Sequence, residues 1–240
     1  LAAIFKTGEK DTCNLVDFDA QTGKILKQFR VSANTVNRFS ISSDASRALI
    51  CTDGKAMVWD LRRGISLRTF QFEVSNIYYC DMSQDGRRIL TGADKPFVSD
   101  PQTGKLIRNV AILWDVDSGE KIRTFQIPDR SSLTLHSLKF SPDGQYLYQN
   151  GEVSTDNIKT DYFWVFEVYS GKLLKTLRGE NSRTRSFQFS NVNRFFISQN
   201  EDNRTSIWDT FDGTLLRTFD TPVWGTFVPP SLSSDGSRLA

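Results

Sequence analysis

One pattern of residues recurs six times along the chain and constrains its fold more than any other feature. In each copy a short apolar run ends in an aromatic residue (once in Ser99), and a glycine follows five residues later. A clear copy is RTSIWDTFDGTLLRTF, from Arg204 to Phe219. The six glycines are Gly23, Gly64, Gly104, Gly119, Gly171 and Gly213. An internal repeat of this kind determines the architecture, because every copy must form the same supersecondary unit.

Each copy is predicted to be a β-hairpin. The runs are too short for helices and rich in β-branched and aromatic residues, and turn residues separate them. The glycine supplies the positive φ that a tight hairpin loop needs. Four residues beyond each glycine comes a basic side chain: Lys27, Arg68, Arg108, Arg123, Lys175 and Arg217. We expect these charges to protect the exposed edge of an outermost strand from pairing with other sheets, in preference to forming a charged belt for a partner.

A second phrase precedes most of these hairpins. It consists of an apolar strand, a turn centred on Asp-Gly or its stand-in, and another apolar strand, as in SLKFSPDGQYLYQ from Ser137 to Gln149. The other copies lie at 38–50, 78–90 and 186–198, with a shortened one at 229–240. Two hairpins in tandem make a four-stranded antiparallel sheet of about forty residues, which is the size of a propeller blade.

The repeats resemble those of the WD-repeat (Trp-Asp repeat) proteins. The resemblance is carried by Trp59-Asp60, Trp114-Asp115 and Trp208-Asp209 and by the SPDG phrase from Ser141 to Gly144, and it covers nearly the whole chain. It implies an all-β fold, a β-propeller of four-stranded antiparallel blades, with five to six blades present out of a ring of seven. The three tryptophans are then expected to be buried between neighbouring sheets.

The chain also departs from the family pattern. Phe18, Ser99 and Phe166 replace the signature tryptophan in three copies, and His136 is the sole histidine. The family's buried turn aspartate maps onto Asp53 and Asp202. Without a matching histidine, the family's Asp-His-Ser/Thr-Trp hydrogen-bond network is expected to be incomplete in every blade.

We expect a single propeller domain spanning residues 1–240, a piece of a longer chain that starts and stops within a blade. The spacing between repeats is longer than elsewhere from Ser83 to Ser141, where two outer hairpins follow one pair of inner strands. The first of these hairpins, with Gly104, is expected to continue its blade. The second would then lack inner strands, which predicts a missing inner half-blade between residues 109 and 110. The segment 151–161 is expected to be a longer polar loop.

Composition limits the classes of partner and the cellular compartments that can be expected. The net charge is only +2, and positive charges are scattered, so no nucleic-acid partner is predicted. No apolar run reaches membrane-spanning length, so no membrane insertion is expected. Three cysteines, Cys13, Cys51 and Cys80, form an odd and sparse set, which argues against a disulfide framework and favours a reducing compartment such as the cytoplasm.

The sequence predicts neither a catalytic set nor a cofactor. One histidine excludes a His-rich metal site, the cysteines lack CxxC spacing, and no glycine-rich phosphate loop is present. We therefore expect no enzyme activity, no metal and no cofactor. His136 is interpreted as a residue that makes a local hydrogen bond, in preference to a catalytic group.

Four residues open the innermost strands: Asn37, Tyr78, His136 and Arg185, each five residues before the serine of the Asp-Gly phrase. In WD-repeat relatives this part of the blade faces the narrow rim of the central channel, where partners commonly dock. Tyr, Arg and His are the composition of an interface hot spot, and Trp224 is placed on the same rim. The alternative is that these residues are plain solvent-exposed strand starts.

The resemblance implies a non-catalytic protein–protein interaction scaffold. It would bind a protein or peptide on the rim as one module of a larger multidomain protein or complex. The alternative is an enzyme or small-ligand sensor similar to YVTN-type propellers, which needs convergent acids or histidines. A stoichiometric metal content would favour that alternative.

Overall fold

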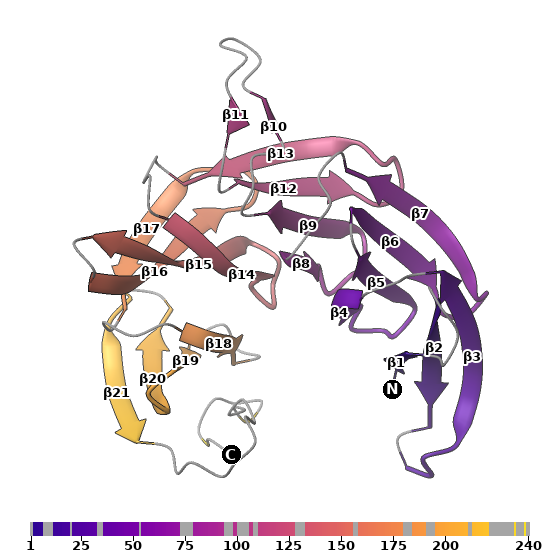
Figure 1. Ribbon diagram of the computed structural model, residues 1–240. Helices are drawn as coiled ribbons and strands as arrows, with labels where there is room; N and C mark the ends of the chain where they lie inside the picture. Colours follow the sequence, from indigo (N-terminus) through magenta and orange to yellow (C-terminus); the bar gives the residue numbers. More distant parts are fainter. Residues whose placement is uncertain are drawn as a thin grey trace. The chain divides into compact units, whose positions relative to one another are not determined.

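The computed structural model describes the residues 2–6, 12–19, 21–32, 36–52, 54–72, 79–93, 98–99, 106–107, 110–127, 133–155, 158–179, 184–190, 195–210, 213–220, 233 and 238. The chain divides into two compact units, Leu1–Gln126 and Ile127–Ala240. Every regular element in the described ranges is a β-strand (Figure 1). The predicted all-β fold is therefore confirmed.

The first unit contains three blade-like antiparallel sheets. A three-stranded sheet has the order β1 (Ala2–Lys6), β2 (Thr12–Phe18), β3 (Ile25–Ser32). A four-stranded sheet follows with the order β4 (Val36–Ile41), β5 (Arg47–Thr52), β6 (Lys55–Asp60), β7 (Ile65–Gln71). The next combines β8 (Tyr79–Met82), β9 (Arg88–Ala93), β12 (Val110–Asp115) and β13 (Lys121–Gln126).

The second unit contains two four-stranded antiparallel sheets. One has the order β14 (Leu133–Phe140), β15 (Tyr146–Thr155), β16 (Ile158–Glu167), β17 (Leu173–Arg178). The other has the order β18 (Thr184–Phe189), β19 (Phe195–Asn200), β20 (Arg204–Asp209), β21 (Leu215–Asp220). Strands that follow one another along the chain are neighbours in both sheets, as in the blades of a WD-type propeller.

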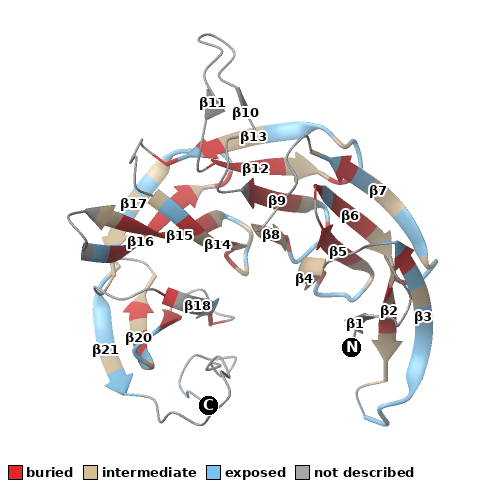
Figure 2. Ribbon diagram, viewed as in Figure 1, coloured by how far each residue is buried: buried red, intermediate tan, exposed pale blue. Residues whose placement is uncertain are grey.

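Burial falls from the middle strands to the outermost ones. Figure 2 shows β5, β6, β9 and β12 mostly buried, whereas β3, β7 and β21 are mostly exposed. In the second unit the core is aromatic, with Tyr148, Phe163, Phe196 and Trp208 packed together. This gradient is the one expected when one edge of each blade lies at the periphery.

The crowded region between Ser83 and Ser141 differs from the expectation. The second outer hairpin, β12–β13, completes the blade, because β12 pairs with β9 over six residues from Val110↔Ala93 to Asp115↔Arg88. The first hairpin, β10 (Val98–Ser99) and β11 (Leu106–Ile107), forms a separate two-stranded sheet. The prediction that this hairpin continues the blade was wrong, because β9 can pair with only one strand on that side.

The pairing of β9 with β12 bears on the predicted missing half-blade. It supplies the inner strands whose apparent absence motivated that prediction. Asn109 itself lies outside the described residues. The missing half-blade therefore stays a prediction, although the strands it was meant to supply are not needed by β12 and β13.

The Asp-Gly turns are held by one repeated set of hydrogen bonds. The hydroxyl of Ser42 donates to Asp44 (2.7 Å) and accepts from the amide of Arg47 (2.9 Å). Ser83 and Ser141 make the same pair of bonds, and the Ser233 hydroxyl accepts from the amide of Arg238. The serine of each phrase thus satisfies backbone donors that the turn leaves open.

The tryptophans show that part of the family network is present. The indole N–H of Trp114 donates to Thr91 and that of Trp208 to Ser198, both at 2.9 Å. Trp208 is buried as predicted, whereas Trp59 and Trp114 are half-buried. Asp202 is exposed, so it is not the buried turn aspartate that the resemblance implied.

The strand register explains why the indole of Trp59 lacks this bond. Trp114 lies opposite Ile89 and Trp208 opposite Phe196, and each indole reaches the residue two places further along that strand. For Trp59 the corresponding residue is Ile50, which has no acceptor. Consistently, the Trp59 Nε1 atom is buried without a hydrogen-bond partner in the described part of the chain.

The basic residues of the outer strands bind the next hairpin. Lys27 Nζ donates to the carbonyl oxygen of Arg62 (2.7 Å), and Arg68 donates to those of Val116 (2.7 Å) and Asp117 (2.6 Å). At these two positions the basic side chain links two consecutive sheets through hydrogen bonds. The expectation of edge protection alone was incomplete there.

Two of the three cysteines are joined. Cys51 on β5 and Cys80 on β8 form a disulfide, and Cys13 is buried outside this bond. The sparse cysteine set did not predict this, because the partners are 29 residues apart with no motif between them. The bond connects two consecutive sheets of the first unit.

Candidate functional site

Three of the residues predicted to bind a partner occupy the same structural position. Asn37, His136 and Arg185 each lie at a register shift in an innermost strand, between Val36 and Arg38 in β4, between Leu135 and Ser137 in β14, and between Thr184 and Ser186 in β18. A β-bulge leaves its extra residue out of the ladder and re-aims its side chain. The sequence positions were thus structurally equivalent, as the repeat had indicated.

The structure describes only some of the residues predicted to lie on the rim. Tyr78 and Trp224 lie outside the described residues, and only the backbone of Arg185 is described. Asn37 and His136 are partly buried. The innermost strands β14 and β18 contact each other within the second unit.

His136 lies beside two buried carboxylates that the sequence analysis did not select. Glu152 on β15 and Asp161 on β16 are only 7% and 1% exposed. One potential ligand atom from each of the three residues lies within 4.8 Å of the other two. Among the described residues this is the one group of His, Cys, Asp or Glu side chains close enough to hold a metal ion.

The two carboxylates face each other across neighbouring strands. Glu152 and Asp161 are direct partners in the β15–β16 register. Like charges at directly opposite positions are destabilising unless something compensates them. Lys159 is one compensating group, with Nζ 3.1 Å from Glu152 Oε1, and Asp161 Oδ2 accepts a hydrogen bond from the backbone amide of Thr184.

The cluster rests on a hairpin that the sequence analysis treated as a loop. The segment 151–161 was expected to be a polar loop, but β15 and β16 continue through it and pair from Tyr146↔Glu167 to Thr155↔Ile158. Each strand is ten residues long, whereas β5, β6, β19 and β20 each have six. The signal that could have revealed the site is this blade's extra length, with acidic residues at both ends of the extension.

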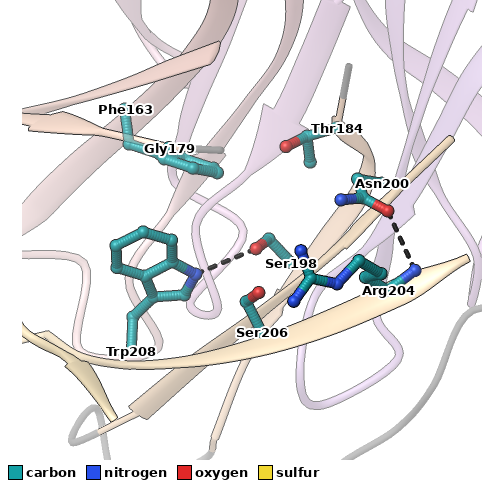
Figure 3. Close-up of a pocket in the computed structure, with 8 residues that line it drawn as sticks. All are labelled: Phe163, Gly179, Thr184, Ser198, Asn200, Arg204, Ser206 and Trp208. Carbon is teal, nitrogen blue, oxygen red and sulfur yellow. Dashed lines mark hydrogen bonds between the residues drawn. The ribbon is translucent and has the colours of Figure 1, made fainter. Parts of the chain in front are cut away.

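A small pocket lies next to the cluster in the same unit. Its volume is about 220 Å³ including its opening to solvent, and its lining includes Thr184, Ser198, Asn200, Arg204 and Trp208. Figure 3 shows the Trp208 indole directed at Ser198 and the backbone amide of Arg204 directed at Asn200. Most of this volume is open to solvent, and the enclosed space is on the order of one water molecule, so the pocket does not suit a small organic ligand.

No described helix has the length and hydropathy needed to cross a lipid bilayer.

Most of the chain is similar in sequence to part of a curated protein. The chain is 28% identical over 204 residues to Transducin-like enhancer protein 2 of Mus musculus, a WD-repeat protein. The match covers 85% of this chain but only 23% of the relative. No family model matches the chain. The observed sheets and this similarity agree with the WD-repeat resemblance, and the chain spans about a quarter of the length of the relative.

Proposed function

We propose that the chain is a non-catalytic interaction scaffold that binds a protein or peptide at the openings of its innermost strands. It would act as one module of a larger protein or complex, without a nucleic-acid partner and without insertion into a membrane. The relative is a WD-repeat protein far longer than the matched region, which supports a module within a larger chain.

The observation that carries the proposal is the repeated bulge. Asn37, His136 and Arg185 leave the ladder at equivalent places on three innermost strands. A residue outside the ladder does not have to alternate between core and solvent, so it can be chosen for contact with a partner. A bulged Asn, His and Arg give polar groups of different shape at equivalent positions, which suits recognition of a specific surface.

Peptide selection tests this function. Peptides are selected from a random library on the purified chain, and their Kd values are measured by fluorescence polarisation for wild type and for the Tyr78→Ala/Arg185→Ala variant. We expect the double variant to bind at least about tenfold more weakly, as for loss of hot-spot contacts, with a nearly unchanged thermal midpoint. The matched control is Arg217→Ala on the exposed outermost strand β21, which should leave Kd unchanged. Equal binding by wild type and the double variant would refute the rim as the binding surface.

One observation favours the enzyme or small-ligand alternative. His136, Glu152 and Asp161 converge, which is the kind of arrangement that such a protein requires. A bound metal alone would not decide between the two functions, because a metal can also stabilise a non-catalytic fold; turnover of a substrate would. The same cluster leads to a more specific inference.

A further inference from the structure

We propose that His136, Glu152 and Asp161 form a binding site for one divalent transition-metal ion with the ligand preference of Zn²⁺. The site lies on the blade β14–β17 and uses one residue from each of three adjacent strands. The three potential ligand atoms already lie within 4.8 Å of one another. Bonds of about 2.0–2.2 Å to a common ion require only a modest approach of the side chains.

Charge is the first argument for a cation. Two carboxylates stand opposite each other in the register, and both are more than nine-tenths buried. Lys159 occupies Oε1 of Glu152, while Oε2 is buried without a hydrogen-bond donor among the described residues. A buried carboxylate oxygen that accepts no hydrogen bond is unfavourable, because the water it has lost is not replaced. A cation bound between Glu152 and Asp161 removes that cost.

The donor atoms indicate which cation fits. One imidazole nitrogen and two carboxylate oxygens are a common ligand set for Zn²⁺. Mg²⁺ and Ca²⁺ prefer oxygen ligands alone, so the imidazole disfavours them. Three protein ligands also leave a fourth position for water or for a group from a bound molecule.

The site depends on two features of this blade that occur together. The bulge takes His136 out of the β14 ladder, and the extended hairpin carries Glu152 and Asp161 beyond the usual strand length. In the next blade β19 ends at Asn200 and β20 begins at Arg204. The positions equivalent to the two carboxylates therefore fall in a turn there. Of these two blades, only the one with the histidine has the acidic pair.

The test is metal binding by the purified 240-residue chain. The chain is prepared without a polyhistidine tag, stripped with a chelator and titrated with ZnCl₂ by calorimetry in a thiol-free buffer. We expect one Zn²⁺ per chain. Co²⁺ should give a d–d absorption spectrum without a thiolate charge-transfer band, because the ligands are nitrogen and oxygen.

Three variants locate the ion. Glu152→Gln keeps the side-chain shape but removes the charge, and should weaken Zn²⁺ binding by at least about tenfold. Lys159→Gln should strengthen binding, because Lys159 competes for Glu152 and is itself 65% exposed and able to leave. Glu120→Gln in an exposed turn is the matched control and should bind as wild type does.

Folding of each variant is checked by circular dichroism, and His136→Gln replaces Glu152→Gln if the latter does not fold. A folded wild-type chain that takes up no Zn²⁺ overturns the proposal. Equal binding by wild type and the folded ligand variant does the same, and so does a thiolate band in the Co²⁺ spectrum.

Discussion

At the scale of single residues, Trp59 and Trp208 occupy equivalent places but meet different surroundings. Trp208 donates to Ser198 at 2.9 Å, while the Trp59 Nε1 atom has no acceptor among the described residues. Trp208→Phe should therefore destabilise the fold by about 1–2 kcal/mol more than Trp59→Phe, since only the first loses a buried hydrogen bond and leaves a hydroxyl unsatisfied. Chemical denaturation gives both free energies of unfolding.

A control removes the effect of ring size. Ser198→Ala deletes the same hydrogen bond without changing the indole, so its effect should match the excess of Trp208→Phe over Trp59→Phe. Equal losses for the two tryptophan variants would show that the indole hydrogen bond contributes nothing to stability.

The Asp-Gly turns predict a pH dependence. Hydrogen bonds from the Ser42 hydroxyl, then from the amide and hydroxyl of Ser46, lower the pKa of Asp44 from 3.8 to about 2. A depressed folded-state pKa contributes stability that is present above the unfolded pKa and is lost as the pH falls toward the folded one. The stability due to this turn should thus disappear between pH 3.8 and about 2.

Thermal midpoints of wild type and Asp44→Asn measure this contribution. The variant should be less stable than wild type at neutral pH, and the difference should shrink across that acidic window. A difference that stays constant from neutral pH to pH 2 would exclude Asp44 as its source.

At the scale of elements, the hairpin β10–β11 is an insertion that the blade does not need. Ala93 and Val110 are direct partners in the β9–β12 register, so a two-residue turn can join them. Replacing residues 94–109 with Asn-Gly should shift the thermal midpoint by no more than a few degrees, on the order of 1 kcal/mol.

Removing residues 110–126 is the contrasting deletion. It takes away β12 and β13, two of four strands in the sheet, and should abolish cooperative unfolding. If the first deletion unfolds the protein and the second does not, the assignment of the two hairpins is reversed.

Strands were predicted well from the sequence where apolar and polar side chains alternate, and poorly where they do not. The repeated glycines and apolar runs located the outer hairpins, and Gly23, Gly64, Gly119, Gly171 and Gly213 all have positive φ. Two equally good hairpin copies could not be ranked from sequence, because the choice depends on which one β9 pairs with. The β15–β16 extension was missed because its polar side chains resemble a loop, although several are buried.

The candidate site shows the same limit. His136 was identified from its place in the repeat, whereas Glu152 and Asp161 were not, because their proximity follows from strand register. The spacing of residues along the sequence does not show which residues of β15 and β16 lie opposite each other. The bulge at His136 was equally unpredicted, since one extra residue leaves the apolar pattern of β14 nearly unchanged.

At the scale of the whole molecule, the Cys51–Cys80 disulfide fastens two consecutive sheets of the first unit. A bond that closes a loop of this length stabilises a fold by about 3–4 kcal/mol, because it restricts the unfolded chain. We expect dithiothreitol to lower the thermal midpoint of the oxidised wild-type chain. The Cys51→Ala/Cys80→Ala variant should be insensitive to dithiothreitol.

Intact mass before and after reduction and alkylation reports the bond directly. Equal responses of wild type and the double variant would show that the two thiols are not joined in solution, and would restore the expectation drawn from composition. Cys13→Ala is the control, since Cys13 lies outside the bond.

The bulges on the innermost strands have a consequence for how such a protein diverges. A residue in a regular ladder points to one face of the sheet, and that face limits which residue types are tolerated. A polar substitution on the inner face, for example, disturbs the packing of the core. At the bulge this constraint is relaxed, and three of the repeats carry Asn37, His136 and Arg185 there. Substitutions at these places can therefore change the polar groups on the innermost strands while the packing of each repeat stays the same.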